Sequence, residues 1–107
     1  MEYILCSAIW YKDLISKKEF DSNVNPLNVD RGLVFCGHRH MQCMYTMCSI
    51  TGLRSVPVEV GEFIQGFLTS KNRFVDREEG LKLAILSEQV VENETINNFK
   101  LFSEDLW

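Results

Sequence analysis

The 107-residue chain has little of what marks a disordered, secreted or membrane-spanning protein. It has only two prolines and six glycines and no polar low-complexity tract, which argues against disorder. No basic run followed by an apolar stretch opens the sequence, so we expect no secretory signal. No apolar run approaches the roughly 18 residues of a membrane span. We therefore predict a cytoplasmic protein that has no membrane contact and whose four cysteines stay reduced.

The length and the hydrophobic content indicate one domain. With 107 residues the chain is too short for two ordinary domains. A hydrophobic fraction of 46% provides enough side chains for a core without help from disulfides or metal. We expect residues 1–107 to form a single domain.

An excess of positive charge is also missing, because the formal net charge is −4. That value argues against a partner that is a nucleic-acid polymer, since phosphate neutralisation needs a basic face. The charge is unevenly spread: residues 1–30 carry −2 (3 basic, 5 acidic), residues 31–77 carry +3 (6 basic, 3 acidic) and residues 78–107 carry −5 (2 basic, 7 acidic). The central segment suits a small anion held in a pocket.

The hydrophobic pattern predicts strands and two helices. Apolar runs over residues 3–11 and 33–36 are typical of buried strands, and residues 56–60, 62–69 and 73–75 read as strands or extended connections. Helices are predicted at about 39–50 and from Asp76, which can cap its first turn together with Glu79, to about Gln89. The fold class is α+β, with a small antiparallel or mixed sheet covered by two helices.

The first predicted helix has a stripe of apolar and sulfur-bearing side chains. Met41, Met44, Tyr45 and Cys48 follow the spacing of one helix face, and Gly52 is a natural stop. We expect this face to lie on the sheet and fill the core.

The string Cys36-Gly37-His38-Arg39-His40, followed by Cys43, has two readings as a site. Its cysteines and histidines have the residue types of a zinc site, but their spacing matches no common zinc module, and we predict no metal and no cofactor. The other reading is a strand-to-helix junction that binds an anion through helix N–H groups and Arg39. The alternative is that Arg39 simply pairs with a carboxylate and the histidines lie on the surface.

A second string, residues 65–77, places aromatic rings beside arginines. Phe67 and Phe74 flank a turn, and Arg73 and Arg77 follow it. A ring next to arginines suits a purine stacked on one side and phosphates held on the other. Equally, both rings could belong to the core and Asp76 could be only a helix cap.

Signatures of known catalytic sites are missing. The sequence has no nucleophile elbow, no P-loop, no dinucleotide-binding glycine motif and no H-E-x-x-H motif. His38 or His40 could act as a general base oriented by Asp76, although nothing in the sequence brings them together.

The order of these segments resembles that of small bacteriophage proteins, and within that group it is similar to the Thoeris anti-defence sponges of the first described type. The resemblance spans about residues 33–107, and Gly66 to Glu79 is its most specific part. The matching segments are Gly37–His40 with Cys43, Gln65–Thr69, Arg73–Glu79, Ala84, Gln89 and Leu101–Trp107.

The resemblance implies a function without catalysis. Such a protein binds a cyclic ADP-ribose isomer, hides this signal from the immune effector in the host cytoplasm and forms a homo-oligomer with pockets between subunits. Some relatives also hold cyclic oligonucleotides at separate sites. On this chain the implied ligand-binding residues are Arg39, His40, Phe67, Thr69, Arg73, Asp76 and Arg77. Of these, Arg39 and His40 would lie near phosphates and Phe67 would stack on a base, while Asp76 replaces an asparagine of the family pattern.

Two other functions remain open at this point. The chain could be a small phosphodiester hydrolase or nuclease that uses His38 or His40. It could also be an interaction module that blocks a host protein through its acidic tail, residues 92–107. The terminal Leu106-Trp107 is apolar, and we expect it to pack against a neighbouring subunit or against its own chain.

Overall fold

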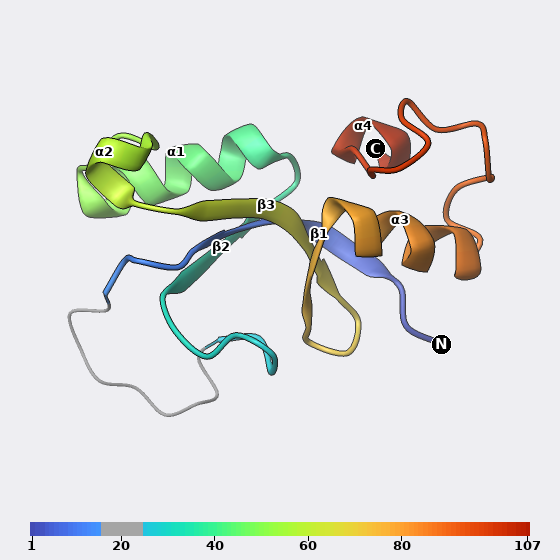
Figure 1. Cartoon of the computed structure of the whole chain (residues 1–107), viewed down its shortest axis with the longest axis horizontal. Helices are drawn as coiled ribbons and strands as arrows, with labels where there is room; N and C mark the ends of the chain where they lie inside the picture. The colour runs from blue at the N-terminus through green and yellow to red at the C-terminus, as the bar shows by residue number, and fades with distance from the viewer. Residues whose placement is uncertain (16–24) are drawn as a thin grey trace.

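A computed structural model describes residues 1–15 and 25–107. It has a four-stranded antiparallel sheet in the order β2-β1-β3-β4 (Figure 1). The strands are β1 (Ile4–Tyr11), β2 (Leu33–Gly37), β3 (Phe63–Thr69) and β4 (Phe74–Asp76). The helices are α1 (His40–Thr51) and α3 (Arg77–Leu86), with one-turn helices α2 (Pro57–Val60) and α4 (Ser103–Leu106). The predicted α+β class is confirmed, and the sheet is antiparallel.

The helices lie on one face of the sheet because the strand register gathers apolar side chains there. Ser7 of β1 pairs with Gly37 on one side and with Phe67 on the other, so alternate residues from these positions share a face. Side chains of this face join those of the helices in two hydrophobic clusters. The buried members of the cluster under α1 and α2 are Ile9, Tyr11, Cys43, Met47 and Val60. Those of the cluster under α3 and the C-terminal segment are Ile4, Phe67, Val75, Leu81, Ala84 and Leu101.

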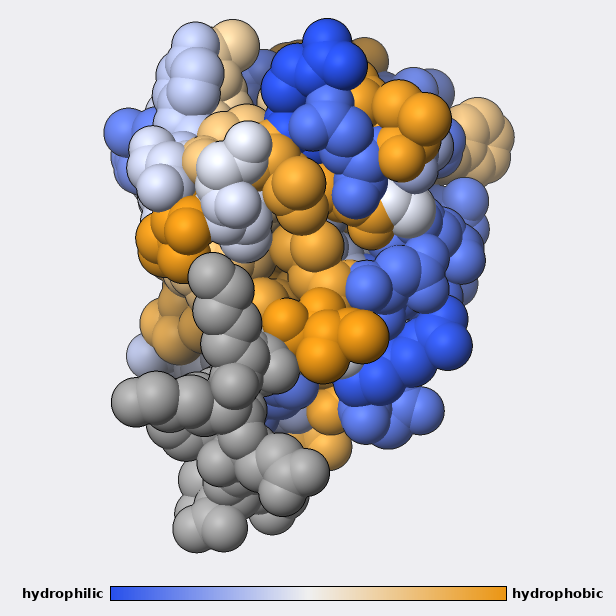
Figure 2. Space-filling view, turned by 90° about the vertical axis from the view of Figure 1, so that its left-hand side faces the viewer, coloured by the Kyte–Doolittle hydropathy of each residue, from blue (hydrophilic) through white to orange (hydrophobic). Residues whose placement is uncertain are grey.

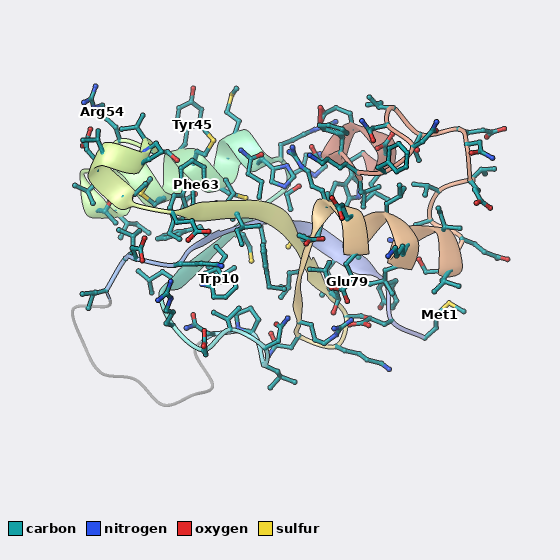
Figure 3. The ribbon with its side chains drawn as sticks, in the orientation of Figure 1. Met1, Trp10, Tyr45, Arg54, Phe63 and Glu79 are labelled. Atoms are coloured by element: carbon teal, nitrogen blue, oxygen red, sulfur yellow. The ribbon has the colours of Figure 1, made fainter. Side chains whose placement is uncertain are left out.

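The buried face of α1 differs from the predicted one. His40, Cys43 and Met47 are buried, and from the predicted stripe Met44 and Cys48 pack against the core. Met41 and Tyr45 are exposed by 61% and 65%. In Figure 3 the Tyr45 side chain projects from α1 away from the sheet, and Trp10 lies on the opposite side of the sheet. Because α1 has apolar and sulfur-bearing residues on more than one side, spacing alone does not select the face. The turn that leads out of β2 selects it.

Two element boundaries also differ from the sequence-based expectation. Residues 57–60 form a helical turn instead of a strand, since Pro57 starts the turn and Gly61 ends it in the left-handed region, with φ of 73°. α3 ends at Leu86, before the predicted end near Gln89. Figure 2 shows apolar side chains gathered at the end of the molecule where α2 lies, and Val58 is exposed by 88%.

The second face of the sheet is covered in part by the segment before β2. Asn28 from this segment accepts a hydrogen bond from the Phe74 N–H at 2.8 Å and donates one to its carbonyl at 2.6 Å. Trp10 packs edge-on against the Phe74 ring, with centroids 5.8 Å apart. In the part of the chain that the structure describes, no helix is long and apolar enough to span a bilayer.

Candidate functional site

The N-terminal ends of the two longer helices meet above the centre of the sheet. α1 starts three residues after β2 ends, and α3 starts directly after β4 with no intervening loop. Each helix places a side chain of its first residue toward β3: His40 from α1 and Arg77 from α3. Arg39, the N-cap of α1, joins them.

His40 links α1 to the sheet. Its Nε2 lies 2.8 Å from the carbonyl oxygen of Gly66, and because a carbonyl only accepts, Nε2 must carry the proton. Its Nδ1 lies 3.3 Å from an Arg77 Nη2, which only donates. The ring meets Phe67 edge-on at 5.2 Å. Burial lowers the pKa of His40, so the imidazole is held in the neutral form.

Gly66 lets β4 lie close to β3 because it has no side chain. A Cβ at this position would lie 2.0 Å from the carbonyl oxygen of Val75 and 2.7 Å from the Phe74 ring. The glycine therefore allows β3 and β4 to pair beside His40.

Arg77 is held from three sides. Its Nη2 donates to Gln65 Oε1 at 2.8 Å and faces His40, and its guanidinium stacks over the Phe102 ring at 4.6 Å. The Nε atom is buried and has no hydrogen-bond partner in the described structure. Burial lowers the pKa of Arg77, which stays far above neutrality.

Arg39 contacts the C-terminal segment. Its Nη1 lies 3.2 Å from Glu104 Oε1, and its Nη2 donates to the main-chain oxygen of Trp107. The Nη1 atom is buried, and Glu104 is the one carboxylate that it meets within the described residues. The Trp107 ring in turn packs on His38, with centroids 5.5 Å apart.

These residues surround a shallow hollow of about 380 Å³. Its lining residues are Arg39, His40, Met41, Arg77, Ser103 and Glu104. Two guanidinium groups line it, and the buried Nε of Arg77 has no hydrogen-bond partner among the described residues. A buried donor without an acceptor costs free energy that an incoming anion would recover. The hollow is thus chemically suited to a phosphate or a carboxylate.

A family model described as phage T4 y16D protein matches residues 3–107. The chain belongs to this phage protein family. The comparison with curated proteins found no match, and neither did the comparison with solved structures. The family description names no ligand, so the chemistry of this phage T4 y16D family member has to be argued from its site.

Three of the seven predicted site residues, Arg39, His40 and Arg77, lie together at this hollow. Phe67 does not, because it is completely buried between the sheet and α3 and offers no ring face to a base. Asp76 is exposed and caps α3, accepting a hydrogen bond from the Glu79 N–H at 2.8 Å. This cap agrees with the structural alternative for Asp76 that the sequence left open.

Thr69 and Arg73 belong to a separate cluster around Glu2. Arg73 donates to both Glu2 carboxylate oxygens at 2.8 Å and lies 3.4 Å from Glu79, and the Thr69 hydroxyl donates to Glu2 at 2.6 Å. These hydrogen bonds lower the pKa of Glu2 to about 2, and the bond from Arg73 has the largest effect. This cluster fastens the N-terminus to the β3–β4 turn.

The sequence reasoning missed five residues of the site: Met41, which it assigned to the core, and Gln65, Phe102, Ser103 and Glu104. Gln65 carried a signal, since it opens the matching segment Gln65–Thr69. The other three lie in the matching segment Leu101–Trp107, but their residue types indicated no ligand, because a charged C-terminal segment is most often solvated.

The zinc reading of the string Cys36 to Cys43 does not fit the geometry. Cys36 pairs with Ala8 on the face of the sheet opposite to that under α1, whereas Cys43 is buried beneath α1. His40 is engaged by Gly66 and Arg77. Within residues 1–15 and 25–107, no group of three or more potential ligands could hold a metal ion.

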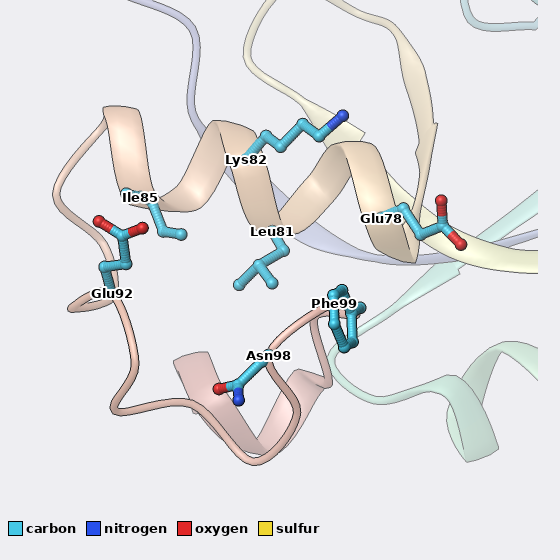
Figure 4. A pocket seen from close by; sticks show the side chains of 7 residues that line it. All are labelled: Glu78, Leu81, Lys82, Ile85, Glu92, Asn98 and Phe99. Atoms are coloured by element: carbon cyan, nitrogen blue, oxygen red, sulfur yellow. The ribbon is translucent and has the colours of Figure 1, made fainter.

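A second hollow, of about 450 Å³, lies between α3 and the segment that follows it (Figure 4). Leu81, Ile85 and Phe99 provide apolar walls, and Glu78, Lys82, Glu92 and Asn98 provide polar ones. Its charges are mixed, and it contains none of the predicted site residues.

Proposed function

We propose that this phage protein is a non-catalytic anti-defence protein that binds and sequesters a small phosphate-bearing signalling nucleotide of the cyclic ADP-ribose type. The observation that carries the proposal is the meeting of Arg39 and Arg77 at one hollow, where the buried Nε of Arg77 has no hydrogen-bond partner among the described residues. The proposal also includes the homo-oligomeric assembly that the sequence resemblance implies.

The donor set favours a ligand with two neighbouring phosphates. Guanidinium groups from two different helices approach the hollow, so a pyrophosphate can contact both, while a single phosphate is better matched to one. Neutral His40 adds no charge, but it fixes Arg77 through the contact at Nδ1.

Aromatic side chains next to the arginines offer places for a base. Phe102 lies under the Arg77 guanidinium, and Trp107 packs on His38 beside Arg39. A purine stacks well on such rings. We transfer the role expected of Phe67 to these accessible aromatics.

The state of His40 supports sequestration over hydrolysis. A general base needs a free ring nitrogen within reach of the reacting proton. In His40, Nε2 donates to Gly66 and Nδ1 faces Arg77. The net charge of −5 over residues 78–107 argues further against a polymeric nucleic acid as the ligand.

A depletion experiment tests the proposal. Purified protein is mixed with cyclic ADP-ribose isomers or cyclic oligonucleotides, the free ligand is measured, and the protein is then heat-denatured. Recovery of intact nucleotide supports sequestration, and recovery of a linear product supports the hydrolase alternative. If no ligand is depleted at protein concentrations of about 100 μM, the proposal fails. Solution mass with and without ligand tests the oligomer, and monomers in both states would contradict it.

A further inference from the structure

The C-terminal segment covers the site with groups of its own. The Glu104 carboxylate reaches Arg39, and the main-chain oxygen of Trp107 accepts from the same guanidinium. Glu104 also contributes to the electrostatic environment of His40 and Arg77. The arginines therefore already have an anionic partner, supplied from within the chain.

Some residues of the C-terminal segment are anchored in the core, whereas the side chains that contact Arg39 are exposed. Leu101 is completely buried, Ser103 is 2% exposed, and the Leu101 N–H donates to the Arg77 carbonyl at 2.9 Å. By contrast, the Glu104 side chain is 58% exposed and Trp107 is 36% exposed. The backbone of α4 can stay in place while the Glu104 side chain and Trp107 swing aside.

The ion pair between Glu104 and Arg39 is well suited to exchange. Exposed ion pairs contribute little to stability, because water and salt compete for both partners. The pair joins Arg39 to a single carboxylate oxygen through one guanidinium nitrogen. A phosphate oxygen at that place can align with the donor better than the tethered carboxylate does.

We infer that Glu104 and Trp107 form an intramolecular strap that stands in for ligand phosphate on Arg39, so that ligand binding replaces the strap. The inference rests on the proposed function, because it assigns regulation to the same hollow. The strap sets a threshold: a single phosphate competes poorly with it, whereas a pyrophosphate that contacts both arginines displaces it. The strap thus makes the site selective for ligands with two linked phosphates over ligands with a single phosphate.

The test compares the full chain with its Glu104→Gln variant, using inorganic phosphate and inorganic pyrophosphate as calorimetric probes. We expect Glu104→Gln to bind pyrophosphate about fivefold more tightly and to narrow the preference for pyrophosphate over phosphate. Glu94→Gln is the matched control, because Glu94 is an exposed carboxylate of the same segment. It should change affinity by less than twofold.

Fluorine NMR follows the strap directly without a destabilising mutation. The chain has two tryptophans, so labelling with 5-fluorotryptophan gives two resonances, which a Trp107→Phe variant assigns. We expect pyrophosphate to shift the Trp107 resonance toward its solvent-exposed position and to leave that of Trp10 unchanged.

The failure of the inference can be distinguished from that of the proposed function. If cyclic ADP-ribose or pyrophosphate binds, but Glu104→Gln binds it equally or more weakly and the Trp107 resonance does not move, the strap is overturned and the binding function stands. If neither compound binds the wild-type chain or the variant, both proposals are overturned.

Discussion

Two clusters of arginine in this molecule have opposite surroundings. The guanidinium of Arg73 is paired with the carboxylates of Glu2 and Glu79. Arg39 and Arg77 converge on a hollow: Arg39 is paired there with the exposed carboxylate of Glu104, and the buried Nε of Arg77 has no hydrogen-bond partner among the described residues. The sequence presents all three as equivalent positive charges of the central segment.

The difference shows that the role of an arginine follows from which acceptors its guanidinium group contacts, and not from the presence of the residue alone. A guanidinium whose donors are all engaged by carboxylates acts as a fastener between segments. One whose donors remain open next to a hollow can still gain free energy from a ligand. The following four predictions test that division.

The largest expected effect is on ligand affinity and should distinguish the two arginine clusters. Arg77→Ala removes one of the two guanidinium groups at the hollow and should weaken nucleotide binding by about 10- to 100-fold, which corresponds to the free energy of one charge-assisted hydrogen bond. Arg73→Ala, the matched control, should bind within about twofold of wild type. Calorimetry with cyclic ADP-ribose measures both. Equal losses for the two variants would remove the distinction.

The next effect concerns the free energy of unfolding, which should be reduced more by the loss of Arg73 than by the loss of an arginine at the hollow. Arg73→Ala leaves the Glu2 carboxylate without its bidentate partner and should lower the free energy of unfolding by about 1 kcal/mol. Arg39→Ala should change it by less than about 0.5 kcal/mol. Urea denaturation followed by circular dichroism measures the two values. A larger loss for Arg39→Ala would mean that the strap is structural.

The same cluster predicts an acid dependence. The folded-state pKa of Glu2 is about 2, below its ordinary value of 4.5, so its contribution to stability is present above pH 4.5 and is lost as the pH falls toward 2. The variant Glu2→Gln should flatten the stability profile in this window. Denaturation series at several pH values test this, and an unchanged slope in Glu2→Gln would contradict it.

The smallest expected effect involves His40. Its folded-state pKa is lowered from 6.5, so the unfolded chain binds the proton more readily and stability should decline as the pH falls below about 6.5. Protonation would also set Nδ1–H against the Arg77 donor. In His40→Gln the decline between pH 6.5 and 5 should be reduced. His38→Gln is the control, because the His38 side chain is exposed.

Local signals in the sequence were sufficient for much of the fold. The cap at Asp76, the stop at Gly52 and the apolar run of β1 each depend on neighbouring residues, and each prediction is confirmed. The buried face of α1 was predicted only in part, because the path of the chain out of β2 decides it: Met44 and Cys48 pack against the core, whereas Met41 and Tyr45 are exposed.

The site could be predicted only in part, because long-range register assembles it. The pairing of β3 with β4 brings Gly66 opposite Asp76, and so places Arg77 beside Gln65 and His40. Nothing local reveals that pairing. Phe67 is covered because Gly80 lets α3 approach closely: a Cβ at Gly80 would lie 3.0 Å from the Phe67 ring. The sequence shows an aromatic residue there but not the helix above it.

The direct passage from β4 into α3 has a consequence for how this site can change. Asp76 ends the strand and also caps the helix, so no spare residue separates the sheet from Arg77. A helix turns its side chains by about 100° per residue. An insertion of one residue after Asp76 would rotate Arg77 away from Gln65 and His40 while the rest of the helix kept its sequence. Any new ligand preference must therefore come from substitutions or from the C-terminal segment, because this junction tolerates no change in length.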